Sequence, residues 1–221
     1  IREPSENFVE GYLSQYFKAA LKEEKIVWMI NRASVQELKK SFERLISHLG
    51  IDGIVLVDGG VDSIMHGDEG KNVLTTKFVD TTLVLAAIQH LEILDDKIIY
   101  ISCNDNSKNQ RVISNNISVI STQGGFYGGC YIVNYMNSYK IMKSAYIYQK
   151  NNNNKLPNID TFIKLTDSDF EEGEEKLGLV QYLFFNPQAL IYNNISIHNI
   201  IELDSYYDII QNIAPLINKN I

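Results

Sequence analysis

The sequence contains little cysteine and no cluster of basic residues. Its two cysteines, Cys103 and Cys130, are too few for a disulfide framework and match no C-x-x-C redox or zinc motif. The chain has 20 Lys and Arg residues against 27 Asp and Glu residues, which gives a net charge of −7. Nucleic-acid binding relies on clustered Lys and Arg, because these side chains neutralise the phosphate backbone. We therefore expect a protein of the reducing cytoplasm that has no nucleic-acid partner.

Long hydrophobic runs are absent as well. A helix that crosses a bilayer needs roughly 20 mostly apolar residues, whereas the apolar stretches at residues 26–30 and 83–88 have the size of core segments. The charged and polar first residues do not resemble a signal peptide. The composition, 45% hydrophobic and 21% charged, is that of a globular protein. We expect no membrane partner and one α/β domain over residues 1–221.

Strand and helix patterns alternate through the first 122 residues. Uninterrupted apolar runs predict strands at residues 25–30, 53–57 and 97–102, and helical spacing predicts helices at residues 6–24, 35–49, 78–91 and 109–122. Ser34 and Glu37 have the spacing of a capping box, and Gly50 is a typical end for the helix that they begin. Uninterrupted apolar strands are typical of burial on both faces. The pattern therefore predicts a parallel sheet with helices on both sides.

The pattern is weaker in the second half of the chain. The expected elements there are a turn at residues 123–129, a helix at 134–150, strands at 179–187 and 189–193, and a helix at 204–213. We expect the two strands to form a hairpin that turns at Asn186 and Pro187, because both residue types favour turns. The Asn-rich residues 151–158 predict a surface linker that is too short to separate two domains.

An acidic loop follows the predicted strand at residues 53–57. The stretch GIVLVDGGVDSIMHGDEG brings together four carboxylates, those of Asp58, Asp62, Asp68 and Glu69. In open α/β sheets, ligands bind beyond the carboxyl ends of the strands, where Asp58 is placed. Crowded carboxylates repel one another, and a cation or a proton relieves that repulsion. Oxygen ligands suit hard ions such as Mg²⁺, Mn²⁺ and Ca²⁺, so the loop predicts a site for a divalent cation.

Three more residues of this loop complete the predicted site. Gly59 and Gly60 allow the backbone to approach a ligand closely. His66 is a candidate nitrogen ligand or general base, and we expect either His66 or the carboxylate of Asp62 to transfer a proton in catalysis. In the alternative interpretation, Asp62 caps a single helical turn that Gly67 ends, and the later carboxylates face water. The loop does not have the spacing of an EF-hand.

Two other segments contribute candidate ligand-binding residues. Asn104 and Asp105 follow the predicted strand at residues 97–102, where they either line the site or cap the next helix. In the segment QGGFYGG, Gly125 and Tyr127 are candidates for contact with a ligand, through stacking or the phenol hydroxyl. The alternative for this segment is a tight connection. It is not a dinucleotide-binding motif, because G-x-G-x-x-G is absent.

Several of these segments together resemble the family catalogued as domain of unknown function 1152. The shared pattern is an apolar strand, a glycine-bearing Asp loop, a Gly-Asp-Glu triplet and a helix rich in Leu and Ala, here residues 54–57, 58–62, 67–69 and 80–92. Two features depart from it: Val61 separates the glycines from Asp62, and residues 104–107, Asn-Asp-Asn-Ser, lack one carboxylate of the family's Asp-Gly-Glu-like stretch. The resemblance implies a Rossmann-like three-layer fold with a mainly parallel sheet and a site at this loop. It also implies that an N-terminal Gly-rich strand-turn-helix is missing, and it brings no assigned activity.

These observations lead to two hypotheses on function. The first is a divalent-metal-dependent enzyme that acts on a small anionic or amino-acid-like metabolite, with the cation bridging the acidic loop and the substrate. The alternative is a non-catalytic protein, either a small-ligand binder or a structural subunit related to such enzymes. The departures at Val61 and residues 104–107 favour the alternative. The oligomeric state is left open by the sequence.

Overall fold

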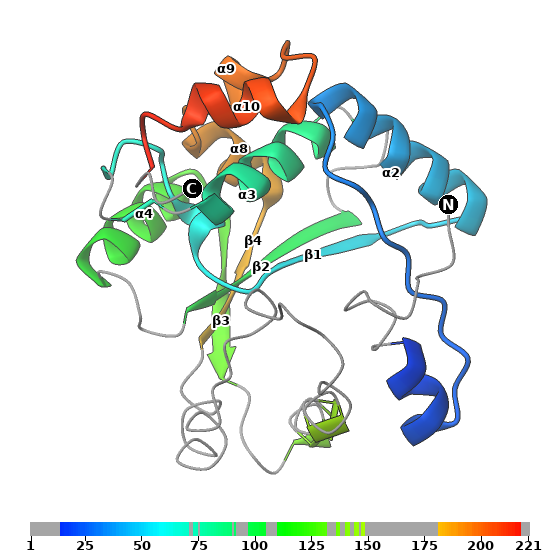
Figure 1. Cartoon of the computed structure of the whole chain (residues 1–221). Helices are drawn as coiled ribbons and strands as arrows, with labels where there is room; N and C mark the ends of the chain where they lie inside the picture. Colours follow the sequence, from blue (N-terminus) through cyan, green and yellow to red (C-terminus); the bar gives the residue numbers. More distant parts are fainter. Residues whose placement is uncertain are drawn as a thin grey trace. The chain divides into compact units, whose positions relative to one another are not determined.

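The chain forms two compact units, which are described separately. The computed structural model describes residues 14–70, 73–74, 76–89, 91, 97–104, 110–131, 136–137, 140–141, 144–145, 147–148 and 181–217 (Figure 1). One unit comprises Ile1–Ile30 and Tyr131–Leu179, and the other comprises Asn31–Cys130 and Val180–Ile221. A compact unit is not by itself an independently folding domain. The single domain expected over residues 1–221 therefore stays a prediction.

The first unit is described mainly by the π-helix η1, Phe17–Leu21. The ring of Tyr16, which is buried, lies 5.6 Å from that of Tyr148, and its hydroxyl donates to the carbonyl oxygen of Ile141 at 3.3 Å. The strand expected at residues 25–30 is wrong, because these residues lie in no helix or strand. An apolar run becomes a strand only where another strand accepts its backbone hydrogen bonds, which a sequence pattern does not reveal.

The second unit contains a four-stranded mixed sheet. Its strands are β1 (Ile54–Asp58), β2 (Ile98–Asn104), β3 (Phe126–Tyr131) and β4 (Gln181–Phe185), in the order β1-β2-β4-β3. The parallel pairing of β1 with β2 is confirmed, and its register runs from Ile54 opposite Ile98 to Asp58 opposite Ser102. However, β2 and β4 are antiparallel, and the sheet is mostly antiparallel. The chain is thus an α/β protein, but the prediction of a mainly parallel sheet is wrong.

The helices of the second unit begin and end close to the predicted limits in the first half of the chain. They are α2 (Val35–Leu49), η2 (Asp62–Ile64), α3 (Thr76–Ile88), α4 (Gln110–Thr122), α8 (Pro187–Asn193), α9 (Ile197–Ile200) and α10 (Tyr206–Ile213). The capping box of α2 is confirmed: the Ser34 hydroxyl accepts from the Glu37 amide at 3.3 Å, and the Glu37 carboxylate accepts from the Ser34 amide. Gly50 ends α2 with a left-handed φ of 61°.

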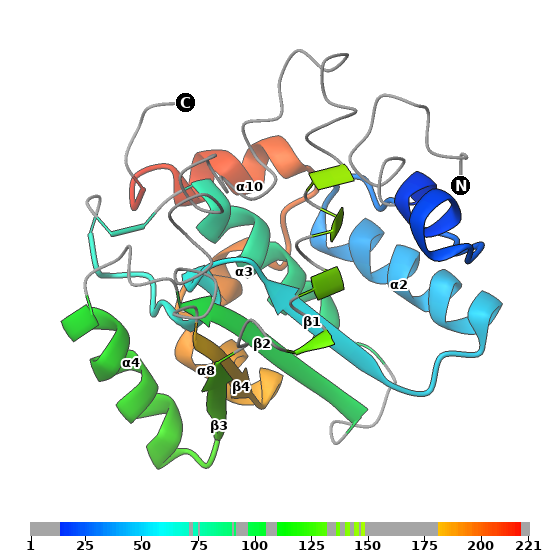
Figure 2. The same ribbon diagram turned by 90° about the horizontal axis from the view of Figure 1, so that it is seen from below.

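The core of this unit lies on one side of the sheet. In Figure 1, α3, α8, α9 and α10 lie on the same side of β1 and β2, and Figure 2 shows the sheet from below. Ile98 and Tyr100 point into the core, whereas Ile99, between them, is 39% exposed. On β1, Val55 and Val57 are 62% and 64% exposed. The expected burial of both strand faces is therefore wrong for β1 and β2.

Two segments of the second half adopt a different structure from the one expected. Residues 126–129 of the predicted turn belong to β3, and residues 189–193, predicted as a strand, belong to α8. The hairpin expected at Asn186 and Pro187 is wrong, because these residues begin a helix: Asn186 Oδ1 accepts from the Gln188 amide at 2.9 Å, and Pro187 occupies the first turn. Asn and Pro favour both turns and helix starts, so the local sequence did not distinguish them.

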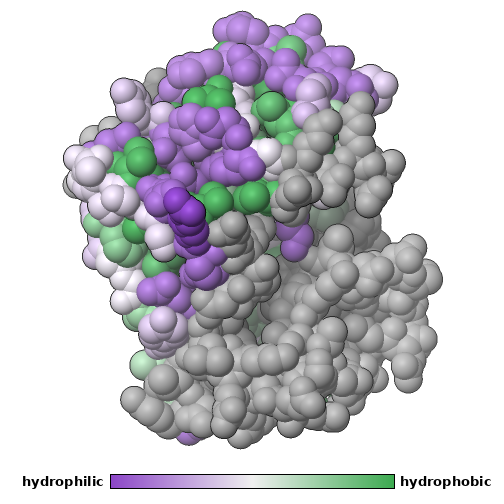
Figure 3. All heavy atoms as spheres, turned by 90° about the vertical axis from the view of Figure 1, so that its left-hand side faces the viewer, coloured by the Kyte–Doolittle hydropathy of each residue, from purple (hydrophilic) through white to green (hydrophobic). Residues whose placement is uncertain are grey.

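One face of the second unit has a mixed polar and apolar surface. Figure 3 shows hydrophilic and hydrophobic side chains interspersed on one face. Among the described residues, no helix has both the length and the apolar character that crossing a membrane requires.

Candidate functional site

Buried polar side chains gather at the carboxyl ends of the two parallel strands. Ser102 is fully buried opposite the last residue of β1, and Asn104, at the end of β2, is 4% exposed. In the loop after β1, Asp62 is 2% exposed and Ser63 is fully buried. Burying a polar group has a free-energy cost unless it finds a partner. This edge of the sheet is therefore the place in the unit where a polar site is best supported.

Asp58 organises the loop that follows β1. Its Oδ1 accepts from the Gly60 amide at 3.0 Å, and its Oδ2 accepts from the Ser63 amide at 2.9 Å. The Gly60 carbonyl accepts from the Cys103 amide at 2.8 Å, which ties the loop to β2. Burial raises the pKa of the Asp58 carboxyl, and the charge of Asp62 raises it further, although the hydrogen bonds from Ser63 and Gly60 oppose the shift.

The carboxylates of Asp58 and Asp62 converge on Gly60. A Cβ at Gly60 would be in van der Waals contact with both side chains, 3.4 Å from Asp62 Oδ2 and 3.7 Å from Asp58 Oδ1. The negative charge of Asp62 disfavours the charged form of Asp58, and a cation bound between the two carboxylates would relieve this repulsion. Gly60, predicted to allow close approach to a ligand, thus lies beside the acidic pair, whereas Gly59 has open space around it.

The hydroxyls of Ser63, Ser102 and Tyr100 lie in the buried region next to Asp58. The hydroxyls of Ser63 and Ser102 are hydrogen-bonded to each other, and the Tyr100 ring, 3% exposed, is part of the same buried region. Burial raises the pKa of Tyr100 far above its usual range, and the charge of Asp58 adds to this effect. The phenol therefore stays neutral, and the described polar groups around Asp58 include the loop amides of Gly60 and Ser63 and the Ser63 hydroxyl.

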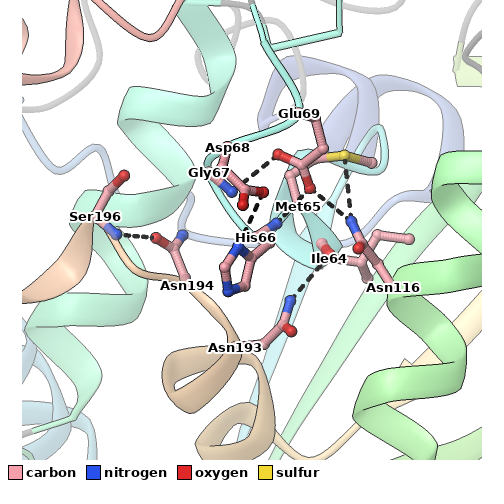
Figure 4. Close-up of polar contacts among 10 residues, drawn as sticks. All are labelled: Ile64, Met65, His66, Gly67, Asp68, Glu69, Asn116, Asn193, Asn194 and Ser196. Carbon is pink, nitrogen blue, oxygen red and sulfur yellow. Dashed lines mark hydrogen bonds and ion pairs between the residues drawn. The ribbon is translucent and has the colours of Figure 1, made fainter.

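Glu69 holds the second half of the loop together (Figure 4). Its Oε1 accepts from the His66 amide at 2.6 Å and from Asn116 Nδ2 at 2.7 Å, and its Oε2 accepts from the Gly67 amide at 2.9 Å. Asn116 belongs to α4, so Glu69 links the loop to that helix. The interpretation that this carboxylate points into water is wrong, because it accepts three hydrogen bonds within the protein.

His66 and Asp68 form a separate, more exposed pair. His66 Nδ1 lies 3.0 Å from Asp68 Oδ1, and the two side chains are 37% and 68% exposed. The His66 carbonyl accepts from the Ile195 amide at 3.0 Å, which attaches the loop to the segment between α8 and α9. Asp68 is placed to orient the imidazole, since a carboxylate at Nδ1 holds the proton on that nitrogen.

The four predicted metal ligands thus have different surroundings. Asp58 and Asp62 converge at the strand end, Glu69 binds loop amides and Asn116, and Asp68 faces His66. Among the residues that the structure describes, no group of three or more His, Cys, Asp or Glu side chains is placed to hold a metal ion. A cation at this edge would therefore depend on the acidic pair together with water or ligand oxygens.

The alternative interpretation of the loop holds for the single helical turn but not for its caps, because Asp62 lies within the turn, and Val61 and Met65 are at the N-cap and C-cap positions. Residues 62–64 form the single turn η2, and the Met65 amide donates to the carbonyl of Asp62 at 3.2 Å. Gly67 follows with a φ of 113°, a conformation that favours glycine. The Asp62 side chain, however, is buried beside Gly60, which places it with Asp58.

The remaining candidates lie in three different surroundings. Asn104 and Gln110 pair through their side-chain amides at 3.1 and 3.3 Å, which joins the end of β2 to the start of α4. Asp105 lies outside the described residues. Gly125 packs against α8, where a Cβ would lie 2.1 Å from that of Ala189. Tyr127, on β3, is 58% exposed.

Sequence reasoning missed Ser63, Ser102 and Asn116. Ser102 lies two residues after Tyr100, on the face of β2 that points into the core, and a polar residue on that face is the signal that could have revealed it. Asn116 had no such signal, because a polar residue in the middle of a polar helix is typical of an exposed face.

Comparisons with known proteins found no protein similar to this chain. A scan against protein-family models, a search of curated proteins and a search of solved structures each found no match. The resemblance to the domain of unknown function 1152 family therefore stays a prediction.

Proposed function

We propose that this protein binds a small anionic or amino-acid-like metabolite at the carboxyl ends of β1 and β2, through a divalent cation held by Asp58 and Asp62. The observation that carries the proposal is the gathering of buried polar side chains at this edge, around two converging carboxylates. Open α/β sheets place their ligands at such an edge. A Rossmann-like three-layer fold and a cytoplasmic location remain parts of the same proposal.

A cation is proposed because the acidic pair would repel an anion that approached it directly. Mg²⁺ is commonly held by one or two carboxylates, and water molecules and substrate oxygens complete its coordination. Two protein carboxylates therefore suffice for a ternary complex with an anionic ligand. The loop amides of Gly60 and Ser63 already donate to Asp58, so they are not directed at a ligand anion.

The test is thermal unfolding of the chelator-treated protein with Mg²⁺, Mn²⁺ or Ca²⁺, alone and with a panel of nucleotides and amino acids. A ligand at 100 times its dissociation constant stabilises the folded state by about 2.7 kcal/mol, which corresponds to about 5–10 °C in the midpoint for a chain of this size. Asp62→Asn should remove the shift. Asp52→Asn, an exposed residue before β1, is the matched control and should retain it. Equal shifts in the parent and Asp62→Asn, or no shift in the parent, would contradict the proposal.

The second candidate function is catalysis by the loop that follows β1, and the contact between His66 and Asp68 in that loop favours it. A carboxylate at Nδ1 leaves Nε2 of a neutral imidazole as a proton acceptor, which is the arrangement of a general base. If the protein is an enzyme, His66→Gln should abolish turnover and preserve the cation-dependent thermal shift. His198→Gln, an exposed histidine on α9, should preserve both. Binding without turnover in the parent would support the non-catalytic alternative.

A further inference from the structure

We draw no further inference here: the strongest candidate, the exposed apolar face of the sheet formed by Val55 and Val57 of β1 and Ile99 of β2, carries nothing because nothing in the structure shows what covers it.

Discussion

At the scale of single residues, neighbouring acids in one loop have different physical roles. Glu69 accepts hydrogen bonds from two loop amides and from Asn116, whereas its neighbour Asp68 is 68% exposed beside His66. A carboxylate that satisfies buried donors contributes more to stability than one in an exposed pair, since water screens the exposed charge. Asp68 and Glu69 are adjacent in sequence and both carry a carboxylate, so the sequence alone does not distinguish their roles.

The first prediction compares these two acids. Glu69→Gln replaces one acceptor oxygen by an NH₂ group that faces other donors, and we expect it to lower the free energy of unfolding by about 1–3 kcal/mol. Asp68→Asn should change it by no more than about 1 kcal/mol. Urea unfolding at neutral pH measures both. Equal losses would show that the contacts of Glu69 do not stabilise the loop.

The second prediction concerns the space at Gly125. A methyl group there would meet Ala189 Cβ at 2.1 Å and Ile120 Cγ2 at 3.0 Å, so α8 or α4 must move. We expect Gly125→Ala to lower the free energy of unfolding by about 1–3 kcal/mol, the usual cost of overpacking. Gly59→Ala is the control, because a Cβ at Gly59 has nothing within 4 Å. Thermal unfolding distinguishes the two variants, and a Gly125→Ala protein as stable as the control would refute the close packing.

At the scale of secondary-structure elements, one cluster joins three separate segments of the second unit. Arg32, which precedes α2, pairs with Asp80 of α3 at 2.7 Å, and the hydroxyl of Tyr206 on α10 donates to the same carboxylate at 2.7 Å. The guanidinium of Arg32 also lies 5.5 Å from the centre of the Tyr206 ring. Partial burial raises the pKa of Tyr206 to about 12, helped by its hydrogen bond to Asp80 and the charge of Asp80.

The third prediction follows from that raised pKa. In the unfolded chain Tyr206 ionises near its ordinary value of 10.0, so between pH 10 and about 12 the folded state holds a proton that the unfolded state has lost. The stabilisation is complete below pH 10 and is lost as the pH rises through this window. Tyr206→Phe removes this contribution, so the stability difference between the parent and the variant should shrink from pH 9 to pH 12. Urea unfolding of both proteins across this range is the measurement; a constant difference would contradict the assignment.

The helix starts also show how far local sequence determines an element. Ser34 and Glu37 predicted the start of α2 because both hydrogen bonds of a capping box lie within four residues. Asn186 and Pro187 were misread because the same residue types serve in turns and at helix starts. What decided between them is tertiary: α8 packs against Gly125, and the Asn186 amide donates to the Gly125 carbonyl at 2.8 Å.

At the scale of the whole second unit, the sheet buries one face and exposes apolar side chains on the other. The fourth prediction uses adjacent residues of β2 to test this arrangement. Ile98→Ala removes a side chain that is 4% exposed and should lower the free energy of unfolding by about 2–5 kcal/mol. Ile99→Ala removes the same atoms from a side chain that is 39% exposed, so we expect less than half that loss. Similar losses in urea unfolding would mean that the second face is buried as well.

The sequence by itself determined the elements whose signals lie within a few residues of one another. Helical spacing predicted α2, α3 and α4, and the capping box predicted the start of α2. The apolar runs predicted β1 and β2 and placed Asp58 at a strand end. The tertiary structure decided the antiparallel pairing of β4 with β2, the burial of one face of the sheet, and the division of the four carboxylates among different partners. These features depend on contacts between residues far apart in the chain, such as Glu69 with Asn116. Their free energy depends on which groups meet in space, and local sequence patterns do not record that information.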